Sequence, residues 1–275
     1  MGIISMKFFA KFWLLGMLWP LSFLAMSADS IPSPSPSAKD IVLPAALITV
    51  GSMGFFDTVR DWDVQVHHEV QSCTHGRRVT FENYVQYVPL AATFAFGLND
   101  MRDDLRMKDR LLLVGTSYAL SATMVTALKY SLVSIRPYIY DEVCAGNPTG
   151  YNRARNPKMF NSFPSGHTAT AFLGAELVRL TCGDEYPVAA WGAYVVAAGV
   201  GFARVYNDRH WATDILAGAG VGILSARIGW WLLPWEQHVL GSWLRTKDAE
   251  SPVETLTVSP SFDGTRPMLA LHITF

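Results

Sequence analysis

The sequence predicts an all-α protein: a helical bundle, membrane-embedded, with a short C-terminal β-hairpin appendix. Three observations support this fold class. Apolar residues gather in six separate runs, each long for a buried strand and rich in Ala, Leu and Gly. Charged residues make up only 16% of the 275 residues. Strand-like alternation of apolar and polar residues is found only after residue 254.

The overall charge is balanced, with 22 Lys and Arg against 23 Asp and Glu. This balance excludes a polycationic nucleic-acid binder and an acidic disordered chain, so we expect no nucleic-acid partner. Three cysteines are too few for a disulfide scaffold. Cys73 and Cys144 lie in polar connections and could pair in an oxidising envelope, whereas Cys182, at an apolar helix end, is expected to be a buried thiol.

The N-terminus has the pattern of an export signal over residues 1–27. Lys7 and Lys11 precede an apolar run from residue 12 to 24, and Ala25-Met26-Ser27 supplies small residues around a cleavage site. The alternative is an uncleaved membrane anchor, because Trp and Pro interrupt the run. Residues 28–40 follow as a Pro/Ser-rich tether, which cannot pair because Pro lacks an amide donor.

The apolar runs predict helices in two parts, an N-terminal helix with a polar connection over 41–85 and a core bundle over 86–234. The runs cover residues 41–56, 87–98, 111–128, 168–178, 188–202 and 215–233. Prolines stand near the helix ends or bends, at Pro44, Pro89, Pro137, Pro164, Pro187 and Pro234.

Only the run 111–128 approaches the roughly 20 uncharged residues that a membrane span needs. The other runs are short, or they contain or border Glu176, Arg179 and Arg227. They must therefore tilt and hide those charges inside a bundle, or else form a soluble helical core. We favour membrane embedding, with the charges buried between helices.

The tail over 235–275 contains alternating apolar and polar residues in place of long apolar runs. Residues 255–259 alternate, residues 262–265 read as a turn, and residues 268–275 alternate again, which predicts a β-hairpin. A terminal Phe after such a strand is also typical of outer-membrane barrels. One hairpin cannot close a barrel, so an appendix of the helical core is favoured.

Three clusters of polar residues stand at apolar helix ends. Lys129 and Arg136 are seven positions apart, nearly two helical turns, so both cations lie on one helix face. In the second cluster, Ser165, Gly166 and His167 begin a helix, where backbone amides and the helix dipole favour an anion. Together these clusters predict a phosphate-binding site.

The third cluster contains Arg204, His210 and Asp214. The last two are four positions apart, close enough for the carboxylate to hold the imidazole. Each cluster alone is weak evidence, since an i,i+4 His/Asp pair is more often a surface contact. All three together, in a charge-poor sequence, are hard to explain as solvated helix faces.

The three clusters resemble the signature of the type-2 phosphatidic acid phosphatase and vanadium haloperoxidase superfamily. That signature reads Lys-x6-Arg-Pro, Pro-Ser-Gly-His and Ser-Arg-x5-His-x3-Asp, and it corresponds here to residues 129–137, 164–167 and 203–214. Ala203 stands where the family usually has Ser, which removes one hydroxyl beside the phosphate. The resemblance implies the family's helical core over about residues 87–234.

The mechanism that the resemblance implies also suits the residue types. His210 would attack phosphorus and form a phosphohistidine, and Asp214 would fix its tautomer. His167 would protonate the leaving group and later activate water. The phosphate oxygens would be held by Lys129, Arg136, Ser165, Gly166 and Arg204.

No metal and no cofactor are expected, because three fixed cations can neutralise the phosphate and the sequence lacks a carboxylate-rich two-metal motif. His67, His68, Cys73 and His75 fit no common zinc spacing. We interpret residues 57–78 around them as a solvated amphipathic segment.

The catalytic clusters share one side of the bundle if the helices alternate in direction. The connection over 99–110, with four cations, would then lie in the cytoplasm and the active site would face the periplasm. The helix over 41–56 would be re-entrant or interfacial. We therefore expect an exported cell-envelope protein of the inner membrane, with a soluble periplasmic location as the alternative.

The predicted activity is a phosphatase acting on a membrane lipid such as phosphatidate, an isoprenyl pyrophosphate or a phosphorylated saccharolipid. The alternatives are a soluble periplasmic acid phosphatase of broad specificity and a vanadium-dependent haloperoxidase. The loop over 138–160, with Arg153, Arg155 and Lys158, either faces an anionic headgroup or is an ordinary solvated loop.

Overall fold

The structure is a computed structural model that describes residues 36–74, 77–99, 105, 107–146, 156–248, 255–263 and 266–274. The expected signal peptide and most of the expected tether lie outside these residues, as do His75, Arg153, Arg155 and the hairpin turn.

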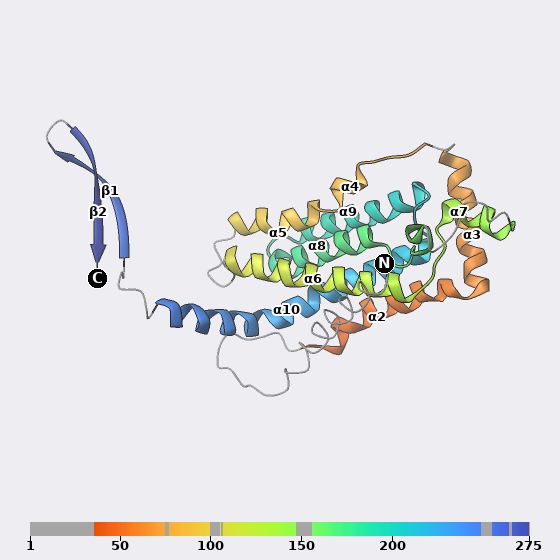
Figure 1. The fold of residues 1–275 in the computed structure, drawn as a ribbon, viewed down its shortest axis with the longest axis horizontal. Coiled ribbons are helices and arrows are strands. Elements are labelled where there is room, and N and C mark those ends of the chain that lie inside the picture. The colour runs from red at the N-terminus through yellow and green to blue at the C-terminus, as the bar shows by residue number, and fades with distance from the viewer. Residues whose placement is uncertain are drawn as a thin grey trace, which may run out of the picture. The chain divides into compact units, whose positions relative to one another are not determined.

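The described chain is predominantly helical, and the predicted all-α bundle is confirmed (Figure 1). The longer helices are α2 (Ala38–Ser52), α3 (Asp57–Thr74), α5 (Val88–Asn99), α6 (Met107–Ser131), α8 (Gly166–Cys182), α9 (Pro187–Tyr206) and α10 (Ala212–Asp248). The short helices are α4 (Glu82–Val85) and α7 (Pro137–Cys144), with 3-10 turns at Met53–Phe55 and Pro157–Phe160.

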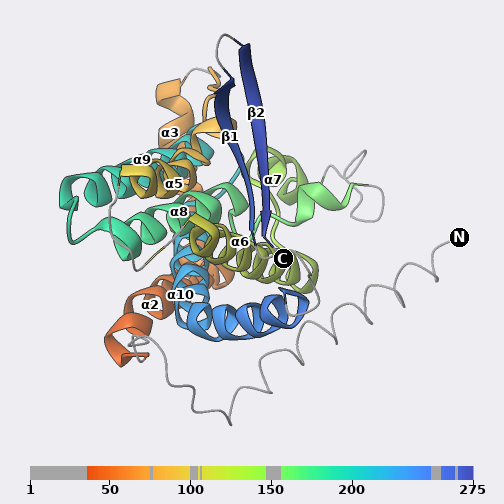
Figure 2. The ribbon, with the colours of Figure 1, turned by 90° about the vertical axis from the view of Figure 1, so that its left-hand side faces the viewer.

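Helix α8 forms the centre of the bundle and contacts α5, α6, α9 and α10 (Figure 1). Most of its residues are buried. Small side chains on one side, including Ala171 and Ala175, pack against α9, while Leu173 and Leu177 belong to a second apolar cluster with α5, α6 and α10. Helix α10 in turn contacts α2 and α6 (Figure 2). The helices that carry the three signature clusters are thereby fixed to one another.

Helices α10 and α8 approach each other closely at Gly222. A Cβ placed on Gly222 would lie 2.2 Å from the Ala169 carbonyl oxygen and 2.9 Å from the Leu173 amide nitrogen. Both are backbone atoms and cannot rotate away. By contrast, a Cβ on Gly199 in α9 would meet nothing within 4 Å.

We expect Gly222→Ala to destabilise the bundle by about 1–3 kcal/mol, because α8 and α10 must separate to admit the methyl group. The matched control Gly199→Ala should leave the melting temperature unchanged or raise it, since Ala favours a helix more than Gly does. Thermal unfolding of both purified variants in one detergent checks the prediction. Equal melting temperatures would contradict it.

Four of the described helices are long and apolar enough to cross a membrane: Ala38–Phe55, Met107–Ser131, Pro187–Tyr206 and Ala212–Leu240. The prediction that only the run 111–128 has this character was therefore too narrow. Helices α9 and α10 extend beyond their uncharged runs, and α10 continues through Pro234 to Asp248. The first helix also has spanning length, so its size does not require the interfacial placement expected for it.

Glu176 and Arg227, two of the three charges expected inside the bundle, are covered and paired there, whereas Arg179 is partly exposed. Glu176 of α8 is fully buried and accepts two hydrogen bonds from Arg179, at 3.0 and 2.7 Å. Arg227 of α10 lies 2.8 Å from the same carboxylate and also pairs with Asp40 of α2. Tyr194 of α9 donates its hydroxyl hydrogen to Glu176. This polar network, which we call the Glu176 network, connects four helices.

The expected solvated amphipathic segment over 57–78 is largely exposed where the structure describes it, but one of its faces is covered. Its residues 57–74 form α3, which buries Asp63, His67 and Thr74. His67 packs edge-on against Trp211, with ring centroids 5.6 Å apart. No disulfide joins Cys73 and Cys144, and Cys182 is buried as expected. Helix α3 is therefore part of the packed structure beside the start of α10.

Two strands follow the helices, β1 (Thr255–Asp263) and β2 (Arg266–Thr274). They pair antiparallel, with Thr255 opposite Thr274 and Asp263 opposite Arg266. This pairing matches the two alternating segments of the predicted hairpin.

Candidate active site

The three signature clusters are brought together by the ends of α6, α8, α9 and α10. Lys129 lies in the last turn of α6, and Arg204 lies in the last turn of α9. Gly166 begins α8, and Asp214 lies in the first turn of α10. A direct contact joins the second and third clusters, because the Ser165 amide donates to the Asp214 carbonyl oxygen at 3.1 Å.

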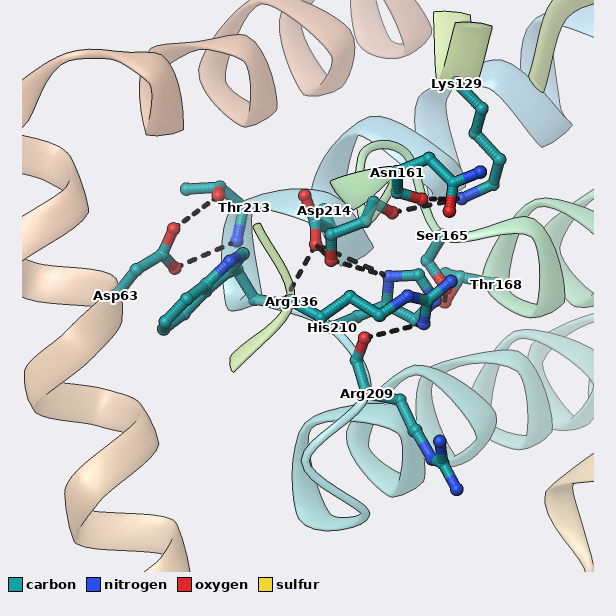
Figure 3. A network of polar contacts seen from close by, with 12 residues as sticks. Asp63, Lys129, Arg136, Asn161, Ser165, Thr168, Arg209, His210, Thr213 and Asp214 are labelled. Carbon is teal, nitrogen blue, oxygen red and sulfur yellow. Dashed lines mark hydrogen bonds and ion pairs between the residues drawn. The ribbon is translucent and has the colours of Figure 1, made fainter. Parts of the chain in front are cut away.

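His210 and Asp214 form the centre of the site (Figure 3). The imidazole Nδ1 lies 3.4 Å from Asp214 Oδ2, and both side chains are buried. The Ser162 hydroxyl donates to the same Oδ2 at 2.5 Å and lies 3.3 Å from Nδ1. The Trp211 amide donates to Oδ2 at 3.0 Å. The carboxylate is thus held in place on the Nδ1 side of the ring.

Two cations of the site are anchored by backbone carbonyl groups (Figure 3). Lys129 Nζ donates to the carbonyl oxygens of Asn161 at 2.9 Å and Ser162 at 3.1 Å. Arg136 donates from Nη1 to the Arg209 carbonyl oxygen at 3.0 Å. These contacts place one cation beside the start of α8 and the other beside His210.

The start of α8 offers amides for an anion. Gly166 is the first helical residue, and the first-turn amides have no acceptor within the helix. The Ser165 side chain does not cap the helix; its hydroxyl oxygen accepts a hydrogen bond from Thr168 at 2.9 Å. The Ser165 hydroxyl is therefore buried, and the contact with Thr168 uses its oxygen as an acceptor but not its hydrogen.

Two signature residues have partners that the sequence did not suggest. Arg204 Nη1 donates to Glu82 at 3.1 Å, and His167 Nε2 lies 3.1 Å from the Asn83 side-chain oxygen. Neither residue hydrogen-bonds to the His210 and Asp214 pair in the described contacts. Ala203, the departure from the family signature, is buried beside Arg204.

The cations and burial together keep both imidazoles neutral. Desolvation by burial, followed by repulsion from Lys129, Arg136 and Arg204, holds the pKa of His210 well below its usual range. Desolvation and the same three cations lower the pKa of His167 to about 4. At neutral pH each ring in the ligand-free site therefore has one unprotonated nitrogen, as a nucleophile or base requires.

Helix α3 supports the turn around His210 from the other side. Asp63 accepts a hydrogen bond from the Thr213 amide at 3.2 Å and another from the Thr213 hydroxyl. The Arg60 guanidinium lies 4.7 Å from the Trp211 ring centre, and the Trp211 indole donates to the Ile135 carbonyl oxygen at 2.7 Å. The residues that flank His210 are thus held between α3 and the segment before α7.

Among the described residues, no group of three or more His, Cys, Asp or Glu side chains is placed to hold a metal ion. His67 and His68 point to different partners, with His67 next to Asp208 at 3.4 Å and His68 next to Asp141 at 3.2 Å. The loop expected over 138–160 is partly helical, because residues 137–144 form α7.

Comparisons with known proteins agree with this arrangement. Residues 110–238 match the family model described as PAP2 superfamily. A lipid A 1-phosphatase of Porphyromonas gingivalis is 34% identical over 188 residues, which are 66% of this chain and 37% of that protein. The bacitracin transport permease protein BcrC of Bacillus licheniformis is 34% identical over 83 residues, 30% of this chain and 39% of that protein. The chain thus spans less than two fifths of the length of these relatives.

Among solved structures, a transmembrane PAP2-type phosphatidylglycerolphosphate phosphatase of Bacillus subtilis aligns with a TM-score of 0.49 at 18% identity. The alignment covers 70% of this chain and 94% of that one. The family match itself covers Lys129, Arg136, Arg204 and the helix start at Gly166, and it includes the His210 and Asp214 pair. The resemblance read from the sequence is confirmed by this match to the PAP2 superfamily model over residues 110–238.

Proposed function

We propose that this protein is a phosphatase that hydrolyses phosphomonoester or pyrophosphate groups of membrane lipids through a phosphohistidine at His210. One observation carries the proposal: a buried, neutral imidazole whose Nδ1 side faces Asp214, which leaves Nε2 for attack on phosphorus. Lys129, Arg136 and Arg204 act electrostatically on the same imidazole, as a site for a phosphate dianion requires.

In the first step the His210 Nε2 lone pair attacks phosphorus, and the bond between phosphorus and the leaving oxygen breaks. His167 transfers its proton to that oxygen. Asp214 stabilises the positive charge that develops on the His210 ring. In the second step His167 takes a proton from water, the water oxygen bonds to phosphorus, and the P–N bond breaks to release inorganic phosphate.

A lipid substrate is supported by the apolar helices and by the names of the relatives. Four helices have the length and composition of membrane spans, so the site lies at the end of a bundle suited to a bilayer. One relative is named a lipid A 1-phosphatase. Phosphorylated saccharolipids, phosphatidate and isoprenyl pyrophosphates are therefore the substrates to compare.

We further propose that the active site faces the periplasm from the inner membrane. Lys108 stands at the start of α6 and Lys129 in its last turn, 21 positions on, so the start of α6 lies at the end of the bundle opposite the site. The cations that the sequence carries at and before this start suit the cytoplasmic side.

We expect the detergent-solubilised protein to release phosphate from these lipids in the presence of a chelator and to be inhibited by orthovanadate. The three cations supply the charge neutralisation, and vanadate adopts the trigonal-bipyramidal geometry of the transition state. A phosphate-release assay over the three lipid classes measures both effects. Loss of activity in chelator, restored by a divalent ion, would contradict the proposed role of the cations. Bromide oxidation in the presence of vanadate would instead identify a haloperoxidase.

A further inference from the structure

A short segment that precedes the family match contacts two of the signature residues. Residues 79–86, which include α4, lie N-terminal to the matched residues 110–238. The consecutive residues Glu82 and Asn83 reach different clusters of the signature: Glu82 contacts Arg204, and Asn83 contacts His167. One short segment therefore touches both a phosphate-binding cation and the proposed general acid.

The contact with Asn83 determines which nitrogen of the His167 ring carries the hydrogen. The Asn83 amide nitrogen Nδ2 donates to the Thr80 carbonyl oxygen at 3.2 Å, which places the side-chain oxygen toward His167 Nε2. An amide oxygen only accepts hydrogen bonds, so Nε2 must carry the hydrogen. Nδ1 is then the nitrogen left for the leaving group and for water.

The contact of Glu82 fixes a guanidinium group. Glu82 Oε1 accepts from Arg204 Nη1 at 3.1 Å and from Asn207 Nδ2 at 2.7 Å, and Glu82 and Arg204 are only 3% and 8% exposed. Asn207 also pairs with both backbone groups of Val79, at 2.7 and 2.8 Å. A buried carboxylate held in this way restricts the guanidinium to one orientation.

We propose that Glu82 and Asn83 are positioning residues of the phosphatase site: Asn83 orients His167 through Nε2, and Glu82 orients Arg204 toward the phosphate. This inference rests on the proposed function, and it extends the active site to a part of the chain outside the family match. The charged and titratable groups around His167 come from several elements: Lys129 of α6, Arg136 before α7, Arg204 of α9, His210 before α10 and Glu82 of α4.

The Asn83 contact is tested by the pH dependence of kcat. Activity should fall as pH rises and His167 loses its proton in the substrate complex. Asn83→Asp places a carboxylate on the Nε2 hydrogen, which favours the imidazolium and should move this alkaline limb up by about one pH unit or more. Asn83→Ala removes the acceptor and should move the limb down. Shifts in opposite directions are the expected result, and a lower kcat in both variants with an unmoved limb would overturn the role of Asn83.

The Glu82 contact is tested by a pair of substitutions. Glu82→Ala should lower kcat/KM by about 10- to 100-fold, mainly through KM, because Arg204 loses its fixed orientation. Glu82→Gln keeps an acceptor oxygen and should restore most of the activity. Glu69→Ala, an exposed carboxylate of α3, is the matched control and should behave as wild type. The role of Glu82 would be overturned if Glu82→Ala had the same kcat/KM as wild type. It would also be overturned if Glu82→Gln unfolded at the wild-type melting temperature but did not recover activity.

His210→Ala, assayed in parallel, distinguishes a failure of the proposed function from a failure of the positioning roles. Activity retained in His210→Ala would overturn the proposed function itself. An inactive His210→Ala variant, beside Glu82 and Asn83 variants that match wild type, would overturn only the positioning roles.

Discussion

Replacement of His210 by Ala is expected to lower kcat for phosphate release by at least about a thousandfold, because the variant has no nitrogen with which to attack phosphorus. The fold should survive, since the contacts among Ser162, Asp214 and the Trp211 amide do not need the imidazole. Phosphate release and thermal unfolding of the same preparation measure the two properties. Retention of more than a few per cent of wild-type kcat would exclude His210 as the nucleophile.

Asp214→Asn provides a graded comparison with His210→Ala. It keeps a polar side chain beside Nδ1 but removes the negative charge that stabilises the imidazolium. The loss of kcat should therefore be smaller than that of His210→Ala, and the two losses should not add in the double variant. Additive losses would show that the two residues act separately.

His167→Ala is expected to have an effect that depends on the leaving group. Lipid alcohols leave as strongly basic alkoxides, so loss of the general acid should slow their hydrolysis by about 10²- to 10⁴-fold. An aryl phosphate needs little protonation, and its hydrolysis should slow far less. The measurement is kcat/KM for both substrate types in wild type and variant, with His210→Ala as the control that loses both.

The charge state of His167 explains why this test is informative. In the ligand-free site, burial and three cations lower its pKa to about 4, so the ring is neutral at pH 7. We expect a bound phosphate dianion to offset the cations and raise the pKa of His167, so that the ring takes up the proton that a general acid donates. Equal losses for the two leaving groups would show that His167 only positions phosphate.

Much of this site was predictable because its signature residues lie at fixed local spacings. His210 and Asp214 are four positions apart, and this spacing is enough to relate them although His210 lies two residues before α10. The helix start at Gly166 is equally local. The shared helix face predicted for Lys129 and Arg136 is wrong, because α6 ends at Ser131 and Arg136 is the extended residue before α7. The apolar runs likewise located the helices, since each run buries a face in the bundle.

The partners of these residues come from distant parts of the chain, and no local sequence pattern predicts them. Ser162 is 52 positions from Asp214, Asn83 is 84 from His167, and Asp63 is 150 from Thr213. Helix α3 looked solvated because its charges are numerous, and only the fold shows that one face is covered. The sequence also did not show that α10 continues beyond Pro234. The neighbouring turns maintain the helix where Pro removes one hydrogen bond.

The Glu176 network has a consequence for how the protein enters a membrane. Each charged residue at the centre of an inserting helix costs about 2.5–3.5 kcal/mol at the translocon. Helix α8 carries both Glu176 and Arg179, and with 17 residues it is shorter than the four candidate spans. The partner Arg227 is made about fifty residues later, in α10. The buried carboxylate of Glu176 therefore gains its cationic partner on another helix only after α10 has been made.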